Sequence, residues 1–157
     1  MNTSSHCPYR QSTLLQQALA PDKMRIAFLL GAGCPARYIL CALEYQLNGH
    51  DHDFESDSIS VEHILPQHPA SGWSAFGEEE ADVMVYRLGN MTLLNKGQNR
   101  DLGNSEFIIK KSVLAVSNFE LTRKVAEDNS DWTPERIAAR QKAMAKIATG
   151  VWRIAQL

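Results

Sequence analysis

A glutamate and a histidine, Glu62 and His63, stand next to each other in a segment of alternating apolar and polar residues at positions 59–65. A histidine with a pKa near neutrality can take a proton from an attacking water. A divalent cation held by a carboxylate can neutralise a phosphate and assist its leaving oxygen. Because neighbouring side chains of an extended segment diverge, one can hold metal while the other faces the water. The pair suits phosphodiester hydrolysis, although an isolated Glu-His pair is more often surface decoration.

A candidate second metal ligand, Asn99, lies further along the chain. Residues 91–94 fit a second short strand, and Asn95 opens a capping-box pattern for a brief helix that ends at Gly103. Asn99 is on this helix and offers a neutral oxygen. A site with few protein ligands leaves coordination positions for water and phosphate, which suits Mg²⁺ or Mn²⁺. This arrangement would suit one divalent cation held by Asn99 and by one member of the Glu-His pair.

Helical patterns surround this strand–loop–strand–helix segment. Thr133 and Pro134 are a strong start signal, because threonine caps a helix and proline suits its first turn. Residues 67–85 look like an irregular insertion with one helical turn. Helices are expected over residues 10–19, 22–29 and 35–47, from Asn104 or Ser105 through Ala115, and from Pro134 to the C-terminus. The chain is therefore predicted to be an α+β domain, mostly helical, with a small embedded ββα unit.

The length and composition fit one domain with a hydrophobic core, since 44% of the 157 residues are hydrophobic. We expect a tail at 1–8 and one domain at 9–157, divided into a helical lead-in (9–50), the ββα core (about 58–103) and C-terminal helices (104–157). No apolar run approaches the roughly 20 residues of a membrane span, and the first residues lack the pattern of a signal peptide. No membrane segment and a cytoplasmic location are expected.

Charge is unevenly distributed, although the net charge is only −2. Residues 51–82 contain acidic side chains and no Lys or Arg, whereas residues 87–124 contain more basic than acidic ones. Attraction of phosphate depends on the local field rather than on the sum. An acidic segment beside a basic one could serve a metal next to a phosphate groove, and ordinary solvated faces would give the same pattern.

Three motifs occur in a fixed order, and together they resemble a known family. They are VEHILPQ at 61–67, RLGNMTLLNKGQNRDLGNSEFIIKK at 87–111, and a W-x-x-x-x-I-x-x-R pattern formed by Trp132, Ile137 and Arg140. Over roughly residues 35–155, the chain resembles the C-terminal HNH nuclease domain (ββα-metal, or His-Me finger) of GmrSD-type modification-dependent restriction proteins. Similar domains occur in phosphorothioate-sensing anti-phage proteins.

The resemblance implies a role for each motif residue. Glu62 and Asn99 would be the metal ligands and His63 the general base. Asn90 would fix the loop and orient the histidine by hydrogen bonding. The acidic position holds Glu rather than the Asp frequent in HNH sites, which lengthens the ligand arm by one methylene. The segment between His63 and Asn90 is also longer than in compact HNH nucleases, so both departures bear on the metal geometry.

Basic residues near the motifs are the candidate nucleic-acid contacts: Lys96, Arg100, Lys110 and Lys111. Arg100 follows Asn99 directly, and its guanidinium fork fits phosphate oxygens. A salt bridge from Arg100 to Asp101 or Glu62 is the alternative. Lys110 belongs to the family pattern N-x-x-F-x-x-K, in which we interpret Asn104 as a cap and Phe107 as core. A helix-surface lysine is otherwise simply solvated.

The resemblance implies a metal-dependent endonuclease that nicks or cuts double-stranded DNA, as the effector of a restriction or antiviral defence protein. In that family a separate N-terminal domain senses modification and uses nucleotide, so this chain is expected to be an excised domain or a stand-alone relative. A non-catalytic DNA-binding or partner-docking module, and a nuclease acting on RNA, are the alternatives. Two smaller hypotheses are a metal site at His50 and His52 with Asp51 and Asp53, and base stacking by Trp73.

Overall fold

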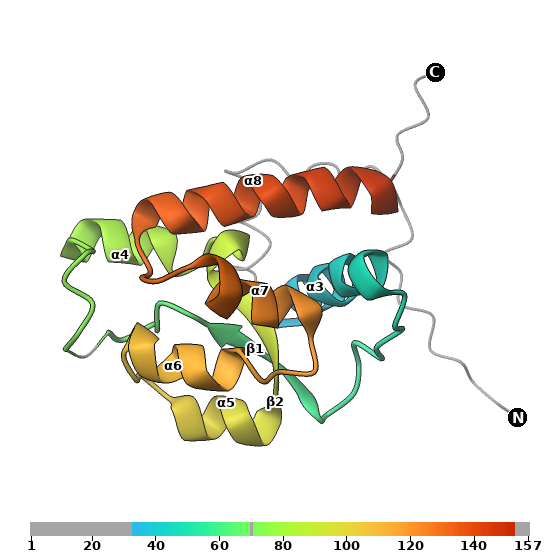
Figure 1. Ribbon diagram of the computed structural model, residues 1–157, viewed down its shortest axis with the longest axis horizontal. Coiled ribbons are helices and arrows are strands. Elements are labelled where there is room, and N and C mark those ends of the chain that lie inside the picture. Colours follow the sequence, from blue (N-terminus) through green and yellow to red (C-terminus); the bar gives the residue numbers. More distant parts are fainter. Residues whose placement is uncertain (1–32, 70, 153–157) are drawn as a thin grey trace, which may run out of the picture.

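A two-stranded antiparallel sheet lies among helices, with α8 along one side and α5 and α6 on the other (Figure 1). The computed structural model describes residues 33–69 and 71–152. In chain order its elements are α3 (Gly33–Asn48), β1 (Ile59–His63), α4 (Glu78–Met84), the 3-10 helix η1 (Leu88–Asn90), β2 (Met91–Asn95), α5 (Lys96–Leu102), α6 (Phe107–Leu114), α7 (Glu120–Asp128) and α8 (Pro134–Val151).

This arrangement confirms the predicted α+β class. The helices expected at 10–19 and 22–29 lie outside the described residues. Within residues 33–69 and 71–152, no helix is long and apolar enough to cross a bilayer.

The two faces of the β1–β2 sheet contact different helices. β1 pairs with β2 so that Val61 lies opposite Leu93 and Glu62 opposite Thr92. Val61 and Leu93 belong to a hydrophobic cluster that includes residues of α3. On the other face, Glu62 contacts α6, and the Thr92 hydroxyl lies 2.8 Å from that of Thr122 on α7. The alternation predicted for this segment is confirmed, because successive residues of a strand point to opposite faces.

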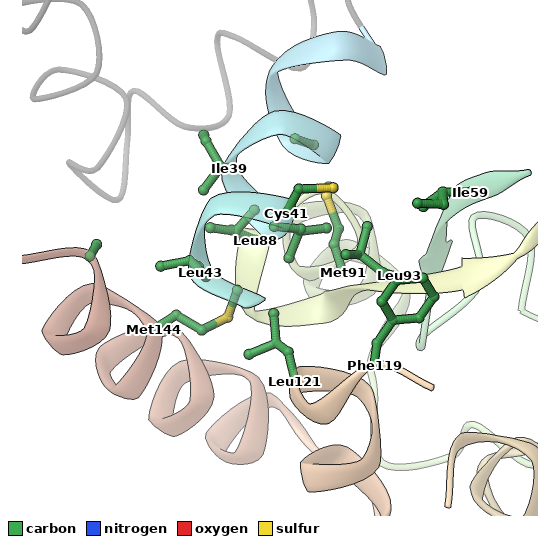
Figure 2. Close-up of a cluster of buried hydrophobic side chains, with 13 residues drawn as sticks. Ile39, Cys41, Leu43, Ile59, Leu88, Met91, Leu93, Phe119, Leu121 and Met144 are labelled. Atoms are coloured by element: carbon green, nitrogen blue, oxygen red, sulfur yellow. The ribbon is translucent and has the colours of Figure 1, made fainter. Parts of the chain in front are cut away.

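Two hydrophobic clusters enclose the antiparallel pair β1 and β2, called the hairpin below, and α8 contributes to both. In the first, Met144 of α8 points toward Leu43 of α3 and Leu121 of α7 (Figure 2). The second cluster packs Leu94 of β2 with side chains of α5, α6 and α7 and with Ile137 near the start of α8. Each fully buried side chain of this kind stabilises the fold by about 1.5–3 kcal/mol. The two strands are therefore packed between helices on both faces.

The last helix begins as predicted and is tied to the segment before β2. Thr133 is the N-cap and its hydroxyl accepts from the Arg136 amide, while Pro134 occupies the first turn. Arg140 donates from Nη1 to the carbonyl oxygens of Gly89 (2.8 Å) and Met91 (2.7 Å). Burial lowers the pKa of Arg140 to about 9, which leaves the guanidinium charged at neutral pH. A Cβ at position 89 would lie 2.3 Å from the Ile137 carbonyl oxygen, so this contact requires glycine.

The predicted bounds of the short helix after β2 are confirmed, because α5 has Asn95 as its N-cap and Gly103 as its C-cap, but the Asn95 side chain makes no capping hydrogen bond. Two other predicted boundaries are wrong. The next helix starts at Phe107 after Glu106, and not at Asn104 or Ser105. The Ser105 hydroxyl donates instead to the Leu102 carbonyl (2.6 Å), which extends the turn after α5 before α6 begins. The insertion at 67–85 contains α4, a helix of 7 residues rather than a single turn.

A buried glutamate of α3 supports the N-terminus of α7. Glu44 accepts hydrogen bonds from the backbone amides of Glu120 (2.5 Å) and Leu121 (2.8 Å), and from Asn48 Nδ2 (2.6 Å). Helix N-termini leave amides without intrahelical partners, and a carboxylate there is favourable. Glu44 thus performs the capping role from a distant part of the chain.

Replacing Glu44 with alanine is expected to lower the free energy of unfolding by about 2–4 kcal/mol, because a part-buried amide (Glu120) and a buried one (Leu121) lose their acceptor. Glu127→Ala, at an exposed position of α7, is the matched control and should change stability by less than about 0.5 kcal/mol. Urea denaturation of both variants measures the difference. Equal stability of the two variants would show that Glu44 does not support the helix.

Candidate active site

The Glu62 carboxylate lies against a lysine of α6. Lys110 Nζ is 2.5 Å from Glu62 Oε1 and 2.9 Å from the backbone carbonyl oxygen of His63. The same ammonium lies over the Trp73 ring, 5.9 Å from its centroid. Lys110 is 0% exposed and Glu62 is 4% exposed. Lys110 therefore contacts both members of the Glu-His pair, one through its side chain and the other through its main chain.

Burial and pairing act on this ion pair in opposite directions. Burial raises the pKa of the Glu62 carboxyl, whereas attraction to Lys110 and hydrogen bonds lower it. Burial lowers the pKa of the Lys110 ammonium, and Glu62 raises it. Removing one partner of a buried ion pair leaves the other charge uncompensated, at a cost of about 3–5 kcal/mol. Each partner therefore depends on the other.

The His63 ring contacts Tyr86 edge-on, with ring centroids 6.1 Å apart and an interplanar angle of 84°. In the strand register His63 lies opposite Met91. Burial, with a smaller contribution from the positive charge of Lys110, lowers the pKa of His63 to about 4. This value lies below the near-neutral pKa expected from the sequence. At neutral pH the ring is neutral, so one ring nitrogen carries the lone pair that a general base needs.

Acid is expected to destabilise the metal-free protein through His63. The folded-state pKa of about 4 lies below the ordinary value of 6.5, so the unfolded chain takes up the proton first as the pH falls. The stability contributed by the neutral ring is complete above about pH 6.5 and is lost as the pH falls towards 4. Between pH 7 and 4.5, wild type should lose about 2 kcal/mol more than His63→Gln in urea unfolding. Equal losses of unfolding free energy in wild type and His63→Gln would contradict the lowered pKa of His63.

Asn99 reaches β1 from α5. Its Nδ2 donates to Ser60 Oγ (2.9 Å) and to the Val61 carbonyl oxygen (3.0 Å). Ser60 and Glu62 are two residues apart in the strand and lie on the same face. Asn99 and Glu62 therefore flank one face of the hairpin. Because Nδ2 is used in this way, Oδ1 is the Asn99 atom that can coordinate a cation.

The donor atoms on this face suit a hard divalent cation. Mg²⁺ and similar ions bind carboxylate and amide oxygens, and two protein ligands leave positions for water and phosphate. In the described part of the chain, no three His, Cys, Asp or Glu side chains form a group that could hold a metal. The alternative site at His50 and His52 is therefore not formed. The His52 ring instead packs against Phe119, with centroids 4.9 Å apart.

Asn90 fixes the loop that follows the Glu-His pair. Its Oδ1 accepts from the Leu65 amide (2.8 Å) and from Trp132 Nε1 (3.0 Å). Its Nδ2 donates to the carbonyl oxygens of Leu65 (2.9 Å) and Val85 (3.1 Å). These four bonds use the full capacity of an asparagine side chain. Asn90 thus fixes the loop that follows His63, and its orienting effect on the His63 ring stays a prediction.

The basic candidates differ in exposure. Lys96 and Arg100 are exposed on α5, and Arg100 forms an ion pair with exposed Asp101 at 3.1 Å. Lys111 is half-buried. Lys110 is fully enclosed and held by Glu62, so the expected surface contact of Lys110 with phosphate is wrong.

The smaller hypothesis, that Trp73 is available for base stacking, is wrong. The side chain is 6% exposed and packs in the second hydrophobic cluster. Its ring lies at a centroid distance of 6.3 Å from that of Phe76. Trp73 therefore covers the buried lysine instead of offering a surface for a base.

Together, β1, β2 and α5 make a ββα unit inside an α+β domain, with a carboxylate, a histidine and an asparagine at its first strand and helix. The family model for the C-terminal domain of GmrSD restriction endonucleases matches residues 16–147. The chain belongs to this family. No curated protein matches it.

Sequence reasoning missed two features of this site. The burial of Lys110 had a local signal, since Phe107, Lys110 and Leu114 share the i, i+3, i+7 spacing of one helix face and are all buried. The hydrogen bond from Trp132 to Asn90 spans 42 residues and had no local signal.

Proposed function

We propose that this chain is a metal-dependent endonuclease of the HNH type that cuts double-stranded DNA, as the effector of a restriction or antiviral defence protein. The observation that supports the proposal most is the position of Asn99, whose Nδ2 donates to Ser60 Oγ and to the Val61 carbonyl oxygen in the strand that also carries Glu62 and His63. Burial also lowers the pKa of His63 to about 4, so its ring is neutral at pH 7. Membership of a family of restriction endonuclease domains supports the same reaction class.

Each residue of the site has a separate task. Glu62 Oε2 and Asn99 Oδ1 would hold one Mg²⁺ or Mn²⁺ ion, which supplies neutralising charge for the phosphate and its leaving oxygen. His63 takes the proton from the attacking water as general base. Asn90 keeps the chain after His63 in one conformation through its bonds to Leu65.

Exposed and half-buried basic side chains would bring the DNA backbone to this site. Lys96 and Arg100 stand on α5, the helix that carries Asn99, and Lys111 stands on α6 beside the buried Lys110. Contacts of this kind bind phosphate without reading bases, so binding should weaken as salt rises. A separate N-terminal domain that senses modification would supply target choice.

Offering a supercoiled plasmid and a structured RNA side by side, with Mg²⁺ or Mn²⁺, tests the proposal. Cleavage of the plasmid in preference to the RNA is the expected result. Preferential cleavage of the RNA would indicate a nuclease that acts on RNA. Binding of the plasmid without cleavage in either cation would indicate a non-catalytic DNA-binding module instead.

A further inference from the structure

The closest pairing in the candidate site involves a residue with no task in the reaction. Lys110 reaches from α6 to the Glu62 carboxylate at 2.5 Å and to the His63 carbonyl at 2.9 Å. It is completely buried, and the Trp73 ring lies beside its ammonium. A buried lysine costs free energy unless a charge partner compensates it, so an enclosed position of this kind calls for an explanation.

We infer that Lys110 is a positioning residue that acts as an internal counter-cation, holding Glu62 and the end of β1 in place before a metal ion binds. The inference rests on the proposed function for the identity of Glu62 as a metal ligand. One ammonium fixes a side-chain oxygen of the ligand and the main-chain oxygen of the next residue, so the Glu-His pair has its geometry without metal.

The charges lead to a definite consequence. With Lys110 present, the nearly buried Glu62 carboxylate is neutralised and the metal-free fold is stable. Without the ammonium, the same carboxylate lacks this compensating charge, and a divalent cation is the natural replacement. Lys110 also repels a second cation near Glu62, so its removal should strengthen cation binding.

The experiment measures thermal unfolding of the chain in chelator and in Mn²⁺, without nucleic acid. In chelator, Lys110→Met should lower the midpoint by about 10 °C relative to wild type. Mn²⁺ should then raise the midpoint of Lys110→Met by at least twice the shift seen in wild type. Leu114→Ala, a buried position on the same helix, is the control: it should lose comparable stability and keep the wild-type Mn²⁺ shift.

A double variant that lacks both charges keeps the test decisive if Lys110→Met does not fold. The double variant Glu62→Gln/Lys110→Met removes both charges, so it should unfold at a higher temperature in chelator than Lys110→Met and show no Mn²⁺ shift. A Mn²⁺ shift of Lys110→Met equal to that of wild type would overturn the inference, as would a double variant no more stable than Lys110→Met. If the wild-type protein did not cut DNA, only the proposed function would be contradicted. The unfolding midpoints in chelator and in Mn²⁺ are measured without DNA and test the role of Lys110 separately.

Discussion

Replacing His63 with alanine is expected to lower the rate of plasmid nicking by about 100- to 10,000-fold, the usual contribution of a general base. Burial lowers the pKa of His63 to about 4, so at pH 7 wild type holds the ring in the neutral form that accepts a proton from water. Alanine has no group that can do so. The rate is measured as conversion of supercoiled to open-circular plasmid under single-turnover conditions.

His68→Ala is the matched control, because His68 is an exposed histidine five residues further along the same segment. It should nick at the wild-type rate. Circular dichroism of His63→Ala should show wild-type helix content, so that lost activity is not lost folding. Wild-type nicking by a folded His63→Ala would remove His63 from the mechanism.

Replacing Asn90 with alanine is expected to lower the free energy of unfolding by about 4 kcal/mol or more, because several buried groups lose their partners at about 1–3 kcal/mol each. These groups are the amide and carbonyl of Leu65, the Val85 carbonyl and Trp132 Nε1. The loss exceeds that of an average core substitution, since one side chain joins three separate segments.

Urea denaturation measures this loss, with Asn104→Ala as the control at an exposed asparagine after α5. The control should stay within about 0.5 kcal/mol of wild type. Below the temperature at which it unfolds, Asn90→Ala should also nick more slowly, because the chain leaving His63 is no longer fixed. A stability loss no larger than that of Asn104→Ala would contradict the role assigned to Asn90.

The sequence predicted those parts of the fold that have local signals. Alternation at residues 59–65 predicted β1 and its two faces, and Thr133 with Pro134 predicted the start of α8. The order of the motifs predicted the family, which the comparison confirms. Local patterns of this kind depend only on neighbouring residues, so a single chain displays them directly.

Features that depend on distant partners were not predictable in the same way. Glu44 caps a helix that begins 76 residues later, and no local pattern marks a glutamate for that task. The helical spacing of Lys110 indicated a buried position, but its partner Glu62, which compensates its charge, lies 48 residues away and had no local signal. The pKa of His63 likewise depends on burial by segments that meet only in the folded chain.

Cation dependence of DNA nicking tests the proposed metal site directly. The wild-type chain should be incubated with supercoiled plasmid in Mg²⁺, in Mn²⁺ and in excess chelator, followed by return of the cation to the chelated sample. We expect nicking in at least one cation, none in chelator, and recovery when the cation is restored. Plasmid left intact in both cations, or cut equally fast in excess chelator, would contradict the assignment of Glu62 and Asn99 as ligands of a catalytic metal ion.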